Sequence, residues 1–178
     1  MSLEPLIDLV GRWQGQSTLQ DPLQGVADES ESKLVVSPLL GGRFVSLDYD
    51  WSYQDQPQEG SLLLGYEPAS QPVTAHWIDS WHMGRGVMAC RGSARGGKYA
   101  VTGSYSVPGG EPWGWRIELE AGPGLHLIMY NITPQGEEGL AVEASYFKVS
   151  LGSLISVCLS GSSTRCSPSF SSAGGRVK

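Results

Sequence analysis

The stretch RFVSLDYDWSY, residues 43 to 53, alternates apolar and polar side chains with a period of two. Successive side chains of a β-strand point to opposite faces, so this period predicts a half-buried strand. Its apolar face collects Val45, Leu47, Tyr49, Trp51 and Tyr53. The stretch WGWRIELE, residues 113 to 120, repeats the pattern with Trp113, Trp115, Ile117 and Leu119 on one face. The sequence therefore predicts a sheet with one apolar, aromatic face and one polar face that is exposed to solvent.

Short runs rich in β-branched and aromatic residues continue along most of the chain, separated by signals such as LLGG, RGG and PGG. Strands are expected near residues 11–20, 30–39, 43–53, 60–67, 72–82, 86–94, 97–107, 113–121, 125–133 and 139–148. The short connections between these runs favour antiparallel hairpins. Closing the sheet into a barrel removes the two edge strands whose backbone N–H and C=O groups would otherwise be unpaired. We therefore predict an all-β fold, an antiparallel up-and-down barrel of about ten strands. A short N-terminal helix is expected at EPLIDLVG, residues 4 to 11.

Length, charge and hydropathy narrow the class of protein. A chain of 178 residues predicts one domain, here over residues 4 to 148. A net charge of -6 would repel a phosphate backbone, so a nucleic-acid partner is not expected. No apolar run approaches the roughly 20 residues of a membrane span, and the N-terminal residues do not have the pattern of a secretory signal. The expectation is a cytoplasmic protein without a membrane span.

The C-terminal residues differ in composition from the rest of the chain. Residues 149 to 178 are rich in Ser and Gly and show no alternation, so they are expected to be a disordered tail or a gene-model artefact. This tail contains Cys158 and Cys166, which leaves only Cys90 in the main body. A disulfide framework is therefore not expected, and Cys90 is interpreted as a buried apolar side chain.

Several motifs in this order resemble a known family. They are LVGRWQGQST (9 to 18), PLLGGRFVSLDY (38 to 49), LLGYEP (63 to 68) and WIDSW (77 to 81). Together they resemble a calycin-like barrel family called domain of unknown function 1579, and the early G-x-W is also similar to lipocalins, fatty-acid-binding proteins and nitrobindins. The resemblance implies a ten-stranded barrel with an apolar cavity, closed at one end by the N-terminal helix and crossed near its base by Trp13.

The stretch HWIDSWHMG, residues 76 to 84, is the densest cluster of reactive side-chain types. As a strand it would place Ser80 and His82 on one face and Asp79 on the other, so a catalytic triad is not expected. His76 and His82 would lie roughly 20 Å apart in an extended chain, too far to share a metal ion. The remaining functional interpretation is that Trp77 and its neighbours line a cavity.

The sequence thus predicts non-enzymatic binding of a small hydrophobic molecule, such as a lipid or fatty acid, in the barrel cavity. The predicted ligand-binding residues are Arg43, Tyr49, Trp51, Trp77, Asp79, Trp81, Trp115 and Met129. For the Trp residues, an equally weighted interpretation is that they only fill the hydrophobic core and contact no ligand. A structural ion pair is an alternative role for Arg43, and a structural hydrogen bond for Asp79.

Three other functions stay open at this point. Nitrobindin-like proteins hold haem iron through a late His, and His126 is the last His in this chain. No cofactor other than haem is expected. A small enzyme would need a general acid or base in the cavity, and no residue marks one. A structural or interaction barrel would take up no ligand.

Overall fold

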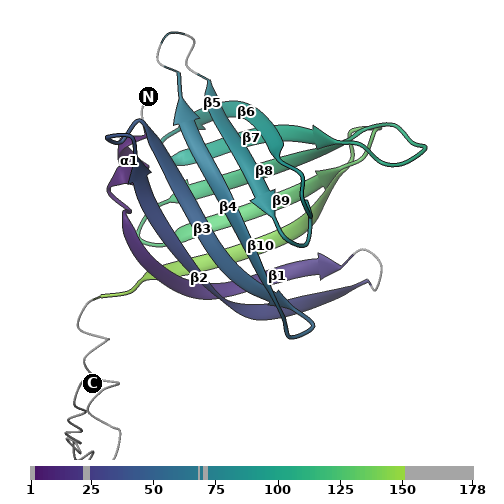
Figure 1. Ribbon diagram of the computed structural model, residues 1–178, viewed down its shortest axis with the longest axis horizontal. Coiled ribbons are helices and arrows are strands. Elements are labelled where there is room, and N and C mark those ends of the chain that lie inside the picture. The colour runs from purple at the N-terminus through teal and green to yellow at the C-terminus, as the bar shows by residue number, and fades with distance from the viewer. Residues whose placement is uncertain (1–2, 22–24, 68, 70–71, 151–178) are drawn as a thin grey trace, which may run out of the picture.

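The structure, a computed structural model, describes residues 3–21, 25–67, 69 and 72–150 and forms a closed antiparallel barrel (Figure 1). Its elements are α1 (Glu4–Ile7), β1 (Gly11–Asp21), β2 (Val26–Leu39), β3 (Phe44–Tyr53), β4 (Gln56–Tyr66), β5 (Val73–Asp79), β6 (Met88–Arg95), β7 (Lys98–Tyr105), β8 (Trp113–Ala121), β9 (Leu125–Ile132) and β10 (Glu138–Lys148). Each strand pairs with its neighbours in the chain, and β1 pairs with β10 to close the sheet. The predicted all-β up-and-down barrel with a short N-terminal helix is therefore confirmed.

Some predicted boundaries are wrong. The helix is a single turn that ends at Ile7. Strand β5 ends at Asp79, three residues before the predicted end at residue 82, and its pairing with β6 stops at Trp77 and Met88. The residues after Asp79 form turns instead of continuing the alternation. This early end changes which side chains reach the barrel interior.

The seam between β1 and β10 joins the two ends of the folded chain. The pairs run from Trp13 opposite Lys148 to Leu19 opposite Val142. A Cβ atom at Gly15 would overlap the backbone carbonyl of β10, so the close approach of the two strands depends on glycine at this position. Residues 151–178, most of the expected tail, lie outside the described residues.

One end of the barrel is packed solid. Leu6 of α1 is fully buried there, and the Trp13 Nε1–H donates a hydrogen bond of 2.9 Å to the Leu9 carbonyl oxygen. Apolar side chains fill the interior above them, among them Leu34, Val45, Leu47, Leu62, Leu64, Leu119, Leu125 and Leu127. The hairpin connections after β3, β5, β7 and β9 lie at the opposite end of the barrel (Figure 1). Within the described part of the chain, no helix combines the length and apolar character that a membrane crossing needs.

Candidate functional site

A side-chain-capped turn follows β5 and sets the geometry of the site. Asp79 Oδ1 accepts hydrogen bonds from the backbone N–H groups of Trp81 (3.0 Å) and His82 (2.9 Å). The Met83 N–H also donates to the Asp79 carbonyl oxygen at 3.0 Å. Asp side chains commonly end strands in this way because they bond the backbone two or three residues ahead. The turn brings the His82 side chain back into the barrel.

His82 and Asp79 form a buried pair. His82 Nδ1 lies 2.9 Å from Asp79 Oδ1, and the two side chains are 10% and 1% exposed. The sequence prediction that these residues face opposite ways is therefore wrong, because the strand ends before His82. A Ser-His-Asp triad is still not formed. The Ser80 hydroxyl lies on the outside, where it donates to Gln58 Oε1 at 2.7 Å.

The second carboxylate oxygen of Asp79 ties β5 to β3. Asp79 Oδ2 accepts hydrogen bonds from the Tyr49 hydroxyl at 3.1 Å and from the Trp51 Nε1–H at 3.3 Å. Tyr49 accepts in turn from the Trp77 Nε1–H at 2.8 Å. These contacts satisfy a carboxylate that would otherwise be costly to bury. Asp79 therefore braces the barrel and orients His82.

The hydrogen-bond network also sets the protonation of its members. Burial alone would raise the pKa of Asp79, but the hydrogen bond and charge of His82 and the backbone N–H groups of Trp81 and His82 lower it below its usual value. Burial raises the pKa of Tyr49 well above its usual value, and the adjacent Asp79 charge adds to the effect. At neutral pH, Asp79 is thus an ionised carboxylate and Tyr49, next to it, is a neutral phenol.

Four indole rings surround the His82 imidazole. Their centroids lie 4.6 Å (Trp81), 5.2 Å (Trp115), 5.5 Å (Trp77) and 5.7 Å (Trp51) from that of His82. The rings of Trp77 and Trp115 stack on each other at 5.3 Å with an interplanar angle of 10°. This aromatic cluster holds the imidazole in place from several sides.

Beside this cluster is a cavity of about 530 Å³ at the barrel end opposite α1. We call it the lumen cavity. It is lined by Leu19, Gln20, Trp77, Trp81, His82, Met83, Met88, Tyr105, Ser106, Trp115, Asn131, Gly139, Leu140 and Ala141. Its volume is within the range of small-molecule sites. No Lys, Arg, Asp or Glu is among these lining residues, so the only side chains there that ionise in water are those of His82 and Tyr105.

Two polar atoms of the lining residues have no hydrogen-bond partner. They are His82 Nε2 and Trp115 Nε1, and both have almost no exposed surface. Most buried polar atoms in proteins are paired, and leaving one unpaired costs about 1–3 kcal/mol. Both unpaired nitrogens lie on the rings that form one side of the lumen cavity.

The predicted ligand-binding residues divide into three groups. Trp77, Trp81 and Trp115 line the lumen cavity. Tyr49, Trp51, Asp79 and Met129 face the interior but border a separate void of only about 10 Å³. Tyr49 and Asp79 also line a hollow on the other side of the sheet. Arg43 lies in the turn before β3 and is exposed, so its predicted inward orientation is wrong. Asp79 is paired with His82 rather than with Arg43.

Sequence reasoning missed His82, Met88, Tyr105 and Asn131 as lining residues. The signal that could have identified His82 was the Asp at residue 79 followed by Gly84, a pattern typical of a turn rather than of a continuing strand. The Tyr105 hydroxyl donates to Asn131 Oδ1 at 2.7 Å, which places two polar groups at the rim of the cavity.

The barrel interior does not fit haem. His126, the candidate iron ligand if haem were bound, is exposed on the outer face of β9, where its Nδ1 lies 3.0 Å from the Ser145 hydroxyl. His82 lies inside, but its Nε2 has almost no exposed surface, and the described residues that line the lumen cavity include no Lys or Arg to pair with haem carboxylates. Among the described residues, no three His, Cys, Asp or Glu side chains are grouped to hold a metal ion.

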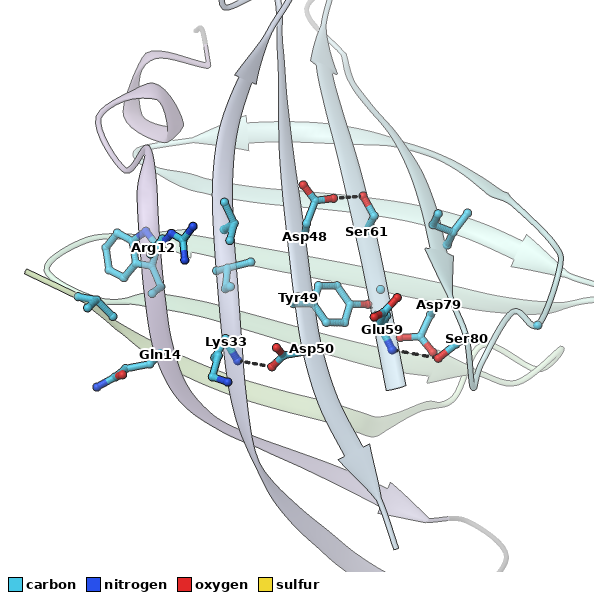
Figure 2. A pocket seen from close by; sticks show the side chains of 17 residues that line it. Arg12, Gln14, Lys33, Asp48, Tyr49, Asp50, Glu59, Ser61, Asp79 and Ser80 are labelled. Carbon is cyan, nitrogen blue, oxygen red and sulfur yellow. Dashed lines mark hydrogen bonds between the residues drawn. The ribbon is translucent and has the colours of Figure 1, made fainter. Parts of the chain in front are cut away.

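A larger hollow of about 860 Å³ lies over the outer face of β1 to β5 (Figure 2). Several of its polar side chains already have partners at the open surface: the Ser61 hydroxyl donates to Asp48 at 2.6 Å, and the Lys33 backbone N–H donates to Asp50 at 2.8 Å. Figure 2 also shows Tyr49 directed toward Asp79 behind this face. The lumen cavity is the better candidate site, because aromatic and other apolar side chains make up most of its wall.

Comparisons with known proteins agree with this fold. No curated protein matches the chain. Among solved structures, the barrel is similar to the crystal structure of Rv2717c from M. tuberculosis, with a TM-score of 0.57 and 14% sequence identity over 83% of this chain and 97% of that chain. At this identity the likeness concerns the fold alone. Residues 4–148 match the model of a family described as a protein of unknown function, DUF1579, and the chain belongs to that family.

Proposed function

We propose that this barrel binds a small, mainly apolar molecule in the lumen cavity without converting it chemically, in the manner of calycin-type carriers. The observation that carries the proposal is the cavity itself, about 530 Å³ beside an otherwise closely packed interior. Protein interiors leave few voids larger than a water molecule, so a space of this size with aromatic and Met walls favours an occupant.

The chemistry of the wall defines what kind of molecule fits. Trp77, Trp81, Trp115, Met83 and Met88 supply apolar and polarisable surface. A ligand that buries about 200 Å² of apolar surface against them would gain roughly 5 kcal/mol from the hydrophobic effect. Asn131 and Tyr105 at the rim add polar groups that can orient the bound molecule.

A cavity-filling substitution tests this proposal. Ala141 lines the lumen cavity from β10 and is 9% exposed, so a Phe at this position would occupy ligand space. Ala89 lies on the outer face of β6 and is exposed, so Ala89→Phe is the matched control. Binding of naphthalene is measured by isothermal titration calorimetry and by quenching of Trp fluorescence.

We expect naphthalene to bind the unaltered protein and the Ala89→Phe variant with similar affinity, and to bind the Ala141→Phe variant at least tenfold more weakly. Native mass spectrometry of the purified protein should in addition detect a bound small molecule that the Ala141→Phe variant loses. If the unaltered protein takes up no apolar probe, the barrel is instead a structural or interaction module.

A further inference from the structure

The mouth of the lumen cavity has side chains that a bound molecule can reach. It is lined by Trp81 and Met83 from the turn after β5, Tyr105 from β7, Asn131 from β9 and Leu140 from β10, all of them at least partly exposed. The first two and Leu140 supply apolar surface, whereas Tyr105 and Asn131 carry polar atoms. These five side chains, the mouth residues, are therefore open to contact with a ligand.

A β-bulge in β10 adds apolar surface to this mouth. Leu140 pairs with Tyr130 and Val142 pairs with Met129, which leaves Ala141 as an extra residue between the two pairs. Consecutive side chains of a regular strand point to opposite faces, yet Leu140 and Ala141 both line the lumen cavity. Leu140 is also 41% exposed, although it is a large apolar side chain. Bulges are common next to binding sites because they redirect side chains in this way.

The polar atoms of the mouth belong to one hydrogen-bonded pair. The Tyr105 hydroxyl donates to Asn131 Oδ1 at 2.7 Å, which fixes the orientation of the amide group. The other end of this amide, Asn131 Nδ2, makes no hydrogen bond to the residues that the structure describes. An amide nitrogen donates hydrogen bonds and accepts none. Asn131 Nδ2 is thus available to an oxygen atom of a bound molecule.

The wall offers no fixed charge to a ligand. Among the described lining residues there is no Lys, Arg, Asp or Glu, so a carboxylate or ammonium group would lose its hydration without a counter-charge. Burial raises the pKa of Tyr105, so its hydroxyl is uncharged at neutral pH. The His82 side chain is only 10% exposed and already pairs with Asp79. These features favour an uncharged ligand.

From this wall the geometry points to an uncharged aromatic carbonyl compound, such as an aryl ketone, as the ligand, with its carbonyl oxygen bound to Asn131 Nδ2. A carbonyl oxygen accepts hydrogen bonds and has no hydrogen of its own that needs a partner. The ring of the ligand contacts Trp81, Met83 and Leu140, since indole rings and thioethers both pack favourably against aromatic groups. This inference rests on the proposed function of the lumen cavity.

Three probes with the same ring system test the inference on the full, unaltered chain by calorimetry. Naphthalene has no polar group, 2-acetylnaphthalene has a carbonyl oxygen, and 2-naphthoate has a charged group of nearly the same shape. We expect 2-acetylnaphthalene to bind about five- to tenfold more tightly than naphthalene, as is typical of one added hydrogen bond. The charged 2-naphthoate should bind at least tenfold more weakly than the ketone.

The possible failures of the two proposals are distinguishable. Equal affinity for naphthalene and 2-acetylnaphthalene would overturn the carbonyl inference and leave the proposed apolar site standing. Tighter binding of 2-naphthoate, or of the cation 2-naphthylmethylammonium, than of the ketone would overturn the choice of an uncharged ligand. Binding of none of the probes would overturn both proposals.

Two variants identify the donor atom. Asn131→Leu combined with Tyr105→Phe removes both polar groups of the pair and largely keeps the side-chain volumes. We expect this double variant to bind naphthalene as before and 2-acetylnaphthalene no more tightly than naphthalene. Tyr105→Phe alone keeps the Nδ2 donor and should retain the preference for the ketone. Gln16→Leu, on the exposed outer face of β1, is the matched control and should change neither affinity. A ketone preference that persists in the double variant, or that Tyr105→Phe alone abolishes, would overturn the assignment to Asn131.

Discussion

His82 Nδ1 lies 2.9 Å from Asp79 Oδ1, although an unbroken strand would direct these two side chains to opposite faces of the sheet. The contact exists because the same carboxylate oxygen also accepts the backbone N–H groups of Trp81 and His82 and so ends the strand. One side chain thus makes the turn and then holds the imidazole that the turn delivers to the cavity wall.

Asp79→Asn should destabilise the barrel by about 2–4 kcal/mol, since it removes the charge that five donors share in a buried site. Urea unfolding followed by Trp fluorescence measures the change. Asp8→Asn is the matched control, because Asp8 is exposed directly after α1. It should change the free energy of unfolding by no more than about 0.5 kcal/mol. Equal stability of the two variants would contradict the role given to Asp79.

Acid should remove the stabilisation that Asp79 provides. Its pKa is lower in the folded protein than the usual value of 3.8, so the charged form favours folding. This contribution is complete above the unfolded-state pKa and is lost as the pH falls through the lower folded-state value. The difference in free energy of unfolding between the unaltered protein and Asp79→Asn should therefore shrink below about pH 4. A difference that grows on acidification would reverse the assigned sign.

Gly60→Ala should disturb the same network from the neighbouring strand. A Cβ atom at Gly60 would overlap the ring of Tyr49, which must move away from Asp79. We expect a loss of about 1–3 kcal/mol in the free energy of unfolding, as for other overpacked cores. Gly139→Ala is the control, because its Cβ would meet nothing within 4 Å. Thermal unfolding of both variants gives the comparison.

Cys90 should be unreactive in the folded protein. It is 2% exposed, and burial raises the pKa of its thiol to about 11, so almost no thiolate is present at neutral pH. In a variant with Cys158→Ser and Cys166→Ser, Cys90 is the one remaining thiol. Iodoacetamide should modify it only after denaturant is added, as followed by intact mass. Rapid labelling without denaturant would show that the β6 wall opens.

The fold was predictable because the barrel strands obey local rules. Alternation in residues 43 to 53 placed Leu47, Tyr49 and Trp51 inside, and all three are buried. Turn signals separated the strands, and hairpin connections then left little choice of topology. The inward positions of Trp77 and Trp115 followed from the same alternation.

The candidate site was less predictable because its key contacts depend on where a strand stops. Extending the alternation past Asp79 put His82 on the outer face, whereas a turn capped by the Asp79 side chain puts it inside. Arg43 was misplaced for the same reason, since β3 begins one residue later at Phe44. Side-chain-to-backbone bonds of this kind override the period-two pattern at strand ends.

The seam between β1 and β10 has a consequence for synthesis. Strand β1 can pair with β2 as soon as both have been synthesised, but its other edge has no partner until residues 142–148 have emerged and can pair with residues 13–19. Throughout translation this edge can pair with another nascent chain. The pairing of β1 with β10 therefore comes last, and it removes the exposed strand edge through which the nascent chain could aggregate.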